Sequence, residues 1–167
     1  MAKIIVISDT HRNQKLLRIA LQNEENYDYI FHLGDYYEDL DENLDLIENA
    51  EIVKVPGILH PGYEDNSLDK IKIITIDNWS FALVHNVLDA MMRRTLANFI
   101  LHGHTHRTEF KEFRKSYLLN PGHLKYEFDR GREASYVTIV TDDKKVNIQW
   151  KDLVGKVFRE ENISEKL

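Results

Sequence analysis

The first third of the chain alternates short apolar, β-branched runs with segments of helical periodicity, and this alternation constrains the fold more than any other feature. The apolar runs are KIIVIS at residues 3–8, YIFHL at 29–33 and EIVKV at 51–55. Each run is short and ends in polar residues, as expected of strands buried on both faces. Between them, helical spacing predicts two helices, with apolar faces made of Leu16, Leu17, Ala20 and Leu21 and of Leu40, Leu44 and Ile47. This order is typical of a parallel sheet with right-handed crossovers.

The second half of the chain is rich in strands that we expect to be mainly antiparallel. Residues 70–76 and 79–85 flank Asp77-Asn78, whose side chains tolerate tight turns, and therefore predict a hairpin. A helix of roughly ten residues is expected from Val87. Further strands are expected at residues 97–102, 108–113 and 116–120, and a last hairpin at 135–140 and 145–150. The sequence thus predicts an α/β fold of two mixed β-sheets packed as a sandwich with helices on the outside, followed by a charged, solvated or frayed tail from Gly155.

Composition narrows the classes of function. The 167 residues, 43% of them hydrophobic, predict a single domain over residues 1–167. The net charge of -6 gives no overall attraction to nucleic acid or anionic membranes, so an anionic substrate needs a local source of positive charge. The chain has no cysteine, which excludes disulfides, thiolate nucleophiles and cysteine-ligated zinc. No run of about 18 apolar residues and no signal-peptide pattern is found, and we expect a cytoplasmic protein.

Acidic and imidazole side chains follow five of the predicted strands. They are Asp9, His11, Asp35, His60, His85, His104 and His106. Ligands gather at the carboxyl ends of strands in open α/β sheets, and residues two apart in an extended segment point the same way. Borderline divalent ions accept both imidazole and carboxylate ligands. Two such ions about 3.5 to 4 Å apart need a bridging ligand, a role that suits Asp35.

Each of these residues also has a structural interpretation. Asp9 suits a helix cap, and Gly34-Asp35 suits a strand-ending turn. His32 and His102 lie inside predicted strands, where a buried, hydrogen-bonded imidazole is the default expectation and support of a metal ligand is the alternative. Caps and turns do not explain why acids and imidazoles recur at so many strand ends, so the joint pattern favours a site.

The pattern resembles the calcineurin-like metallophosphoesterases, in particular the small single-domain phosphodiesterases of bacteria and archaea. The resemblance extends from about Lys3 to about Trp150. It rests on the segments SDTHRN, HLGD, the histidine closing WSFALVH, GHTH and Asn120-Pro121-Gly122. It implies two divalent metal ions of unassigned identity, with manganese, nickel, iron, cobalt and zinc all acceptable. In that family pattern Asp9, His11 and His106 hold the first ion, Asp35 bridges, and His85 and His104 hold the second.

The resemblance also implies a function. A small phosphodiester or phosphomonoester would bind across both ions and be hydrolysed by a metal-bridging hydroxide. No membrane partner is expected, nucleic acid is an unlikely substrate, and exposed late strands make a homodimer reasonable.

Four positions depart from the family pattern. Ile58 stands where an asparagine normally completes the second metal site, which weakens that site. His60 stands where aspartate is usual, and it is either a replacement ligand, an acid that protonates the leaving oxygen, or a surface histidine. Val87 replaces a second histidine after His85. His123 stands where serine is more usual; it either points towards the site or, as the default expectation, is exposed.

Two other functions compete with metal-dependent hydrolysis. A retromer subunit of the same fold is mainly an interaction scaffold, and loss of the asparagine fits that role. DNA-repair exonucleases share the fold but carry added domains or a basic track, which this sequence does not show. Six costly polar groups converging on one point favour the enzyme.

Overall fold

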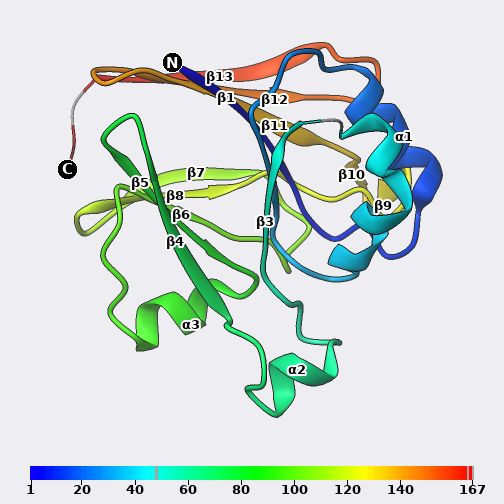
Figure 1. The fold of residues 1–167 in the computed structure, drawn as a ribbon, viewed down its shortest axis with the longest axis horizontal. Helices are drawn as coiled ribbons and strands as arrows, with labels where there is room; N and C mark the ends of the chain where they lie inside the picture. Colours follow the sequence, from blue (N-terminus) through cyan, green and yellow to red (C-terminus); the bar gives the residue numbers. More distant parts are fainter. Residues whose placement is uncertain (48, 165, 167) are drawn as a thin grey trace.

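A six-stranded sheet carries both the first and the last strands of the protein (Figure 1). The structure is a computed structural model that describes residues 1–47, 49–164 and 166. The strand order is β13-β12-β11-β1-β2-β3, in which β1, β2 and β3 are parallel and the other pairs are antiparallel. The strands span β1 Ala2–Ile7, β2 Tyr29–His32, β3 Glu51–Lys54, β11 Tyr136–Thr141, β12 Val146–Lys151 and β13 Val157–Ile163.

A second sheet of five strands lies against the first, in the order β4-β5-β6-β8-β7. Its three middle strands are parallel, and β4 and β7 pair antiparallel at the edges. The strands span β4 Ile71–Ile76, β5 Trp79–Val84, β6 Phe99–Leu101, β7 Glu109–Phe113 and β8 Ser116–Asn120. A separate two-stranded hairpin joins β9 (Phe128–Asp129) to β10 (Arg132–Glu133).

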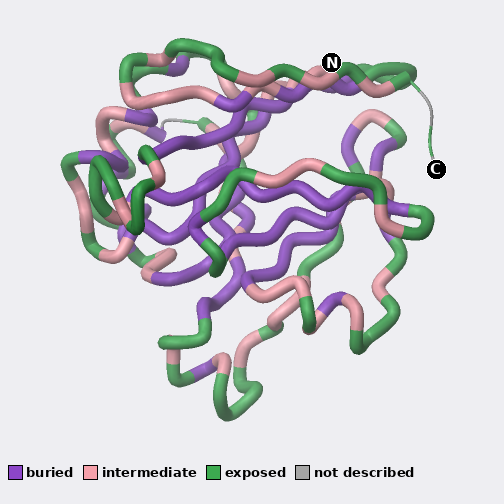
Figure 2. The backbone as a smooth tube through the Cα atoms, turned by 180° about the vertical axis from the view of Figure 1, so that it is seen from behind, coloured by how far each residue is buried: buried purple, intermediate pink, exposed green. Residues whose placement is uncertain are grey.

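The side chains of β1 alternate between two cores, which sets the order of the layers. Ile4 and Val6 face the second sheet and pack in the cluster between the sheets, whereas Ile5 and Ile7 pack against α1 (Gln14–Gln22). The 3-10 helix η1 (Tyr37–Leu46) covers the same outer face. The short helices α2 (Pro61–Glu64) and α3 (Val87–Met92) follow later, and α3 packs on the outer face of the five-stranded sheet. The predicted sandwich with outer helices is confirmed, and the inner strands of its two sheets, such as β1, β5 and β8, are among the most buried parts of the chain (Figure 2).

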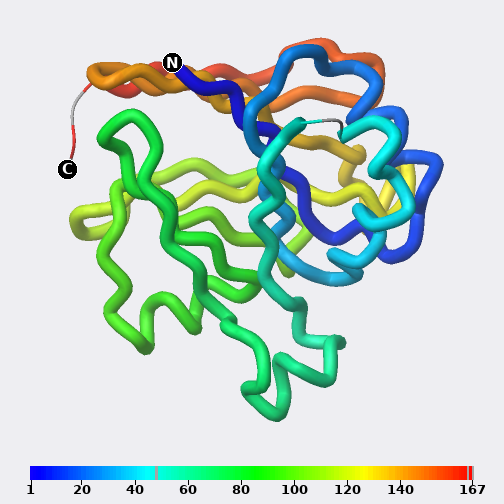
Figure 3. Tube along the Cα trace, in the orientation of Figure 1, coloured from blue at the N-terminus to red at the C-terminus, as the bar shows by residue number. Residues whose placement is uncertain are grey.

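The tail predicted from Gly155 is exposed to solvent, as expected, but most of it is an ordered strand rather than a frayed end. Residues 157–163 form β13, which pairs with β12 at the edge of the first sheet (Figure 3). Its polar side chains find cross-strand partners, because the amide of Asn147 donates to Glu160 at 2.6 Å and Arg159 lies 4.9 Å above the Trp150 ring. An edge strand exposes one face to water, so a charged sequence is compatible with it. Glu165 and Leu167, within the same predicted tail, lie outside the described residues.

Two predicted helices differ in detail. Leu44 is 57% exposed, since η1 has the tighter 3-10 geometry and a break at Asn43, and the spacing of an α-helix does not keep one face inward there. Helix α3 is shorter than predicted. It ends where Arg94 adopts φ +52° and Thr95 N–H donates back to the Ala90 carbonyl, a Schellman-type termination. In the described part of the chain, no helix is both long and apolar enough to cross a membrane.

Candidate metal centre

Strand ends from both sheets bring acids and imidazoles to one place. Asp9 and His11 follow β1, Asp35 follows β2, His85 closes β5, and His106 lies in the loop after β6. The distance from His106 Nε2 to Asp9 Oδ1 is 3.2 Å, and that from His85 Nε2 to Asp35 Oδ1 is 3.4 Å. His11 Nε2 lies 3.6 Å from Asp35 Oδ2. The two oxygens of Asp35 thus face different histidines, the geometry a bridging carboxylate requires.

These atoms form two groups in which every ligand atom lies within 4.8 Å of the others. One group is Asp9, His11 and His106, and the other is Asp9, Asp35 and His85. Ligand atoms each about 2.0 to 2.2 Å from one ion lie a little more than 3 Å from each other, so the observed separations suit a cation between them. Asp9 belongs to both groups. Asp35 belongs to the second group, and its Oδ2 also lies 3.6 Å from His11 Nε2 of the first.

The hydrogen-bonding state of these buried atoms is a direct test of the fit to metal. Asp9 Oδ1, His11 Nε2, Asp35 Oδ1 and His85 Nε2 have no hydrogen-bond partner among the described residues. Buried polar atoms without partners are costly and rare, and here four of them face one another. The donor set, two carboxylates and imidazole nitrogens, is the set that borderline divalent ions accept, so the residues fit the expected metal.

The remaining polar atoms of the same side chains are held by the protein. Asp9 Oδ2 accepts from the Ser8 hydroxyl at 2.6 Å and from the His104 backbone N–H at 3.0 Å, which leaves Oδ1 facing the centre. His85 Nδ1 lies 2.7 Å from the Leu33 carbonyl and can only donate there. This contact fixes the tautomer in which Nε2 presents a lone pair to a metal.

Two glycines allow the strand ends to approach this closely. A Cβ at Gly57 would lie 2.0 Å from Asp35 Oδ1 and 2.2 Å from the Asp35 backbone nitrogen. A Cβ at Gly103 would lie 1.9 Å from Ser8 Oγ and 2.7 Å from Asp9 Oδ2. Any other residue would push Asp35 or Asp9 away from the centre.

The backbone around the centre is strained. Non-glycine residues in the left-handed region cluster here; they are Asp9, His11, Arg12, Asp35, Tyr36, His104 and His106. Such conformations are disfavoured for L-residues and persist where surrounding contacts impose them, commonly at functional sites. The surrounding contacts therefore hold the ligand side chains after these strands in fixed positions.

Burial and mutual charge set the ionisation of the site. Burial raises the pKa of Asp9, but the contacts with His106, His85 and Ser8 together outweigh it, and the pKa falls below its ordinary value. The pKa of Asp35 is likewise lowered, because its close contacts with His85 and His11 together outweigh burial and the repulsion of Asp9. Both carboxylates are therefore ionised at neutral pH. The same contacts raise the pKa of His85 and His106 against the effect of burial, so a bound cation would take the place of their protons.

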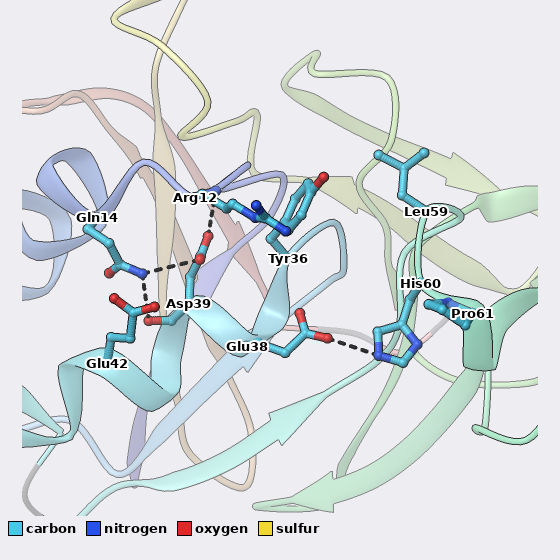
Figure 4. Close-up of a pocket in the computed structure, with 9 residues that line it drawn as sticks. All are labelled: Arg12, Gln14, Tyr36, Glu38, Asp39, Glu42, Leu59, His60 and Pro61. Carbon is cyan, nitrogen blue, oxygen red and sulfur yellow. Dashed lines mark hydrogen bonds and ion pairs between the residues drawn. The ribbon is translucent and has the colours of Figure 1, made fainter.

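His104 and His60 are not brought into either group. The His104 ring lies 5.2 Å from the His85 ring, and burial lowers the pKa of His104. His60 caps α2 by accepting from Gly62 N–H through Nδ1, while its Nε2 lies 2.9 Å from Glu38 Oε1. Figure 4 shows the ion pair with Glu38 across a cavity of about 680 Å³. Ile58 is 40% exposed and supplies no ligand atom.

Three other histidines are buried around the centre. His32 contacts the Thr10 hydroxyl at 3.2 Å and His102 contacts Glu109 at 2.9 Å, so the prediction of hydrogen-bonded interior histidines is confirmed. Burial lowers the pKa of His32 to about 3, which keeps it neutral. The prediction that His123 is exposed is wrong: it is fully buried, with its ring 5.2 Å from that of His106. Backbone bonds from Leu124 to Asp9 and from Ser135 to His123 draw its loop inward.

Sequence reasoning missed two carboxylates that support the centre. Asp129, in the β9–β10 hairpin, places Oδ2 2.6 Å from His106 Nδ1. Asp39, in η1, accepts from the Thr10 hydroxyl at 2.6 Å and from Arg12 N–H at 2.8 Å, and so holds the loop after β1. Figure 4 shows Asp39 between Arg12 and Gln14. Neither residue lies directly after a predicted strand or within a segment that carries the family resemblance.

The contact with Asp129 predicts a measurable role. Replacing Asp129 with alanine is expected to lower metal affinity or hydrolytic activity about 10- to 100-fold, because a carboxylate partner orients a ligand histidine and raises its basicity. Metal titration followed by elemental analysis would measure the change. Glu133→Ala removes an exposed carboxylate from the same hairpin and serves as the control. Equal metal affinity in the two variants would contradict this role.

The sequence model of the calcineurin-like phosphoesterase superfamily domain matches residues 2–144. The chain belongs to this superfamily. Within it, the chain is 28% identical over 137 residues to a phosphodiesterase of Methanocaldococcus jannaschii, covering 72% of this chain and 82% of that protein. The superfamily implies divalent metal ions, in agreement with the two ligand groups.

Solved structures of this superfamily fold superpose over nearly the whole chain. A phosphoesterase of E. coli, Yfce, matches with a TM-score of 0.72 at 16% identity, over 97% of this chain and 98% of that one. Vps29 of Entamoeba histolytica complexed with Zn²⁺ matches with a TM-score of 0.68 at 22% identity, over 96% and 98%. At these identities the likeness shows the fold.

Proposed function

We propose that this phosphoesterase-family protein hydrolyses small phosphodiesters with two divalent ions held by the groups that share Asp9. The single observation that carries the proposal is the set of four buried, unpartnered ligand atoms that face one another. Divalent cations bound between these atoms would satisfy all four of them. In this proposal Asp35 bridges the ions, His11 and His106 complete the first, and His85 and His104 complete the second.

The chain's own residues have the charge and the ionisation state needed to hold the two ions. A bound pair of divalent ions would offset the charge of a phosphate ester and lower the pKa of a water molecule so that it attacks near neutral pH. Asp9 and Asp35 are ionised and supply the negative charge that holds the cations. His11, whose pKa burial lowers, is neutral and free to ligate. A role for His60 in protonating the leaving oxygen stays a prediction.

The experiment that tests the proposal combines metal content with turnover. Protein loaded with manganese or nickel is expected to bind up to two ions per chain and to hydrolyse bis(p-nitrophenyl) phosphate, and chelation is expected to abolish turnover. Elemental analysis and p-nitrophenolate release provide the two measurements. Less than about one ion per chain together with no turnover would contradict hydrolysis and favour the scaffold, the alternative to which Ile58 points.

We further propose that residues 1–167 form one metallophosphoesterase domain. The superfamily match ends at residue 144, but β12 and β13 extend the sheet that carries β1 and β2. A cytoplasmic location and a homodimer stay predictions from the sequence.

A further inference from the structure

A cavity of about 480 Å³ opens directly over the candidate metal centre. Its walls include four of the proposed ligands, His11, Asp35, His104 and His106. The other side is lined by four cationic residues, Arg107, Lys125, Arg130 and Arg132, which we call the basic rim. A volume of this size holds a small molecule. A ligand bound at the metal centre would therefore contact the basic rim.

The basic rim is largely unneutralised. In the described part of the chain no carboxylate forms an ion pair with Arg107, Arg130 or Arg132, and Lys125 lies 4.0 Å from Asp129 Oδ1, at the limit for such a pair. Arg132 Nη1 donates to the Thr105 carbonyl at 3.2 Å, which holds its guanidinium beside the loop of His104 and His106. In a protein of net charge -6, four cations gathered at one cavity, three of them without an ion pair, are a concentration of charge that the fold does not require.

The β9–β10 hairpin carries Arg130 and Arg132, and its turn has an arginine at a position that disfavours this residue. Asp129 pairs with Arg132, so Arg130 and Gly131 form a two-residue turn with φ of +52° and +75°. Glycine, asparagine and aspartate are the usual residues at both positions of such a turn, and arginine is strained at the first. The same hairpin anchors Asp129 to His106 and so fixes the rim relative to the metal centre.

We propose that the basic rim binds a second phosphate group of the substrate, so that the preferred substrates are small phosphate esters carrying another phosphate besides the one hydrolysed. This inference rests on the proposed function. A phosphodiester has one negative charge, and a pair of divalent ions already balances it, so a simple diester leaves the basic rim without an anionic ligand. A neighbouring phosphate dianion supplies the acceptor oxygens that guanidinium groups bind best.

The test compares two esters that differ only in the second phosphate. Thymidine 5'-(p-nitrophenyl phosphate) and its 3'-phosphorylated form release the same p-nitrophenolate from the same diester. The manganese-loaded protein is expected to show a kcat/KM about 10- to 100-fold higher for the 3'-phosphorylated ester, the gain that one or two charge-assisted hydrogen bonds provide. Raising the ionic strength is expected to shrink the preference, because the rim is partly exposed.

Variants of the rim test its origin. Arg130→Asn removes a charge while suiting the left-handed turn, and is expected to bring the ratio of the two kcat/KM values to within about 3-fold of unity. Arg107→Gln provides a second variant outside the hairpin, expected to lower the ratio in the same direction. Lys144→Ala is the matched control, since Thr141 pairs with Ala2 and places Lys144 at the far end of β1 from Asp9; its ratio is expected to equal that of the native protein.

The outcomes separate the two proposals. Hydrolysis of both esters with equal kcat/KM, or an unchanged ratio in both rim variants, overturns the second-phosphate site and leaves the hydrolase intact. Hydrolysis of neither ester by protein that holds its metal overturns the proposed function itself.

Discussion

Asp35→Asn is expected to lower kcat/KM for bis(p-nitrophenyl) phosphate by at least about 1,000-fold. Loss of an outer partner of a ligand typically costs about 10- to 100-fold, and loss of a ligand shared by two ions costs more. Asp35 presents Oδ1 to His85 and Oδ2 to His11, and an amide cannot replace both charged oxygens. Metal content per chain is expected to fall together with the rate.

The same variant separates loss of metal from loss of fold. Although burial and the repulsion of Asp9 raise the pKa of Asp35, its contacts with His85 and His11 lower it overall, so the ionised carboxylate adds stability at neutral pH and the metal-free variant is expected to melt somewhat lower than the metal-free native protein. The native melting temperature should rise on adding manganese and that of the variant should not. Asp45→Asn, which alters a 59% exposed carboxylate paired with Arg18, is the control. Activity within 10-fold of native in Asp35→Asn would refute the bridging role.

The residues at the strand ends were predictable because their signal is local. A buried run such as KIIVIS marks the end of its own strand, and parallel topology gathers such ends at one edge of the sheet. Asp9, Asp35 and His85 were assigned on this basis together with the superfamily resemblance, and the structure brings them within coordinating distance of one another.

The supporting residues were not predictable because their role depends on long-range packing. Asp129 contacts His106 only after the β9–β10 hairpin folds across the loop that follows β6, and nothing in the segment EFDRGR marks that contact. The sequence favours an exposed His123, but a backbone bond from Leu124 to Asp9 and one from Ser135 to His123 draw its loop inward. The pairing of β13 depends on polar side chains of β12, which a pattern based on apolar residues does not detect.

Gly57→Ala is expected to lower the free energy of unfolding by about 3 kcal/mol or more and to abolish metal binding by the group of Asp9, Asp35 and His85. Overpacking of a rigid site typically costs about 1 to 3 kcal/mol, and the clash here is at the upper end because it involves backbone. The new methyl group would meet the Asp35 backbone nitrogen at 2.2 Å and its Cα at 2.7 Å, so a side-chain rotation gives no relief. Chemical denaturation and elemental analysis are the measurements.

Gly155→Ala is the control that separates the cost of a steric clash from the cost of an unfavourable backbone conformation. Gly155 has φ +78° and its nearest neighbour to a new Cβ lies at 3.6 Å, so alanine fits but is strained, at a cost of about 1 to 2 kcal/mol, and metal content should not change. Gly57 has no left-handed φ, and its variant suffers only from the closeness of Asp35. The role of this contact would be contradicted if Gly57→Ala were as stable as Gly155→Ala and still bound both ions. The close approach of Gly57, after β3, to Asp35 would then not be what positions the bridging carboxylate.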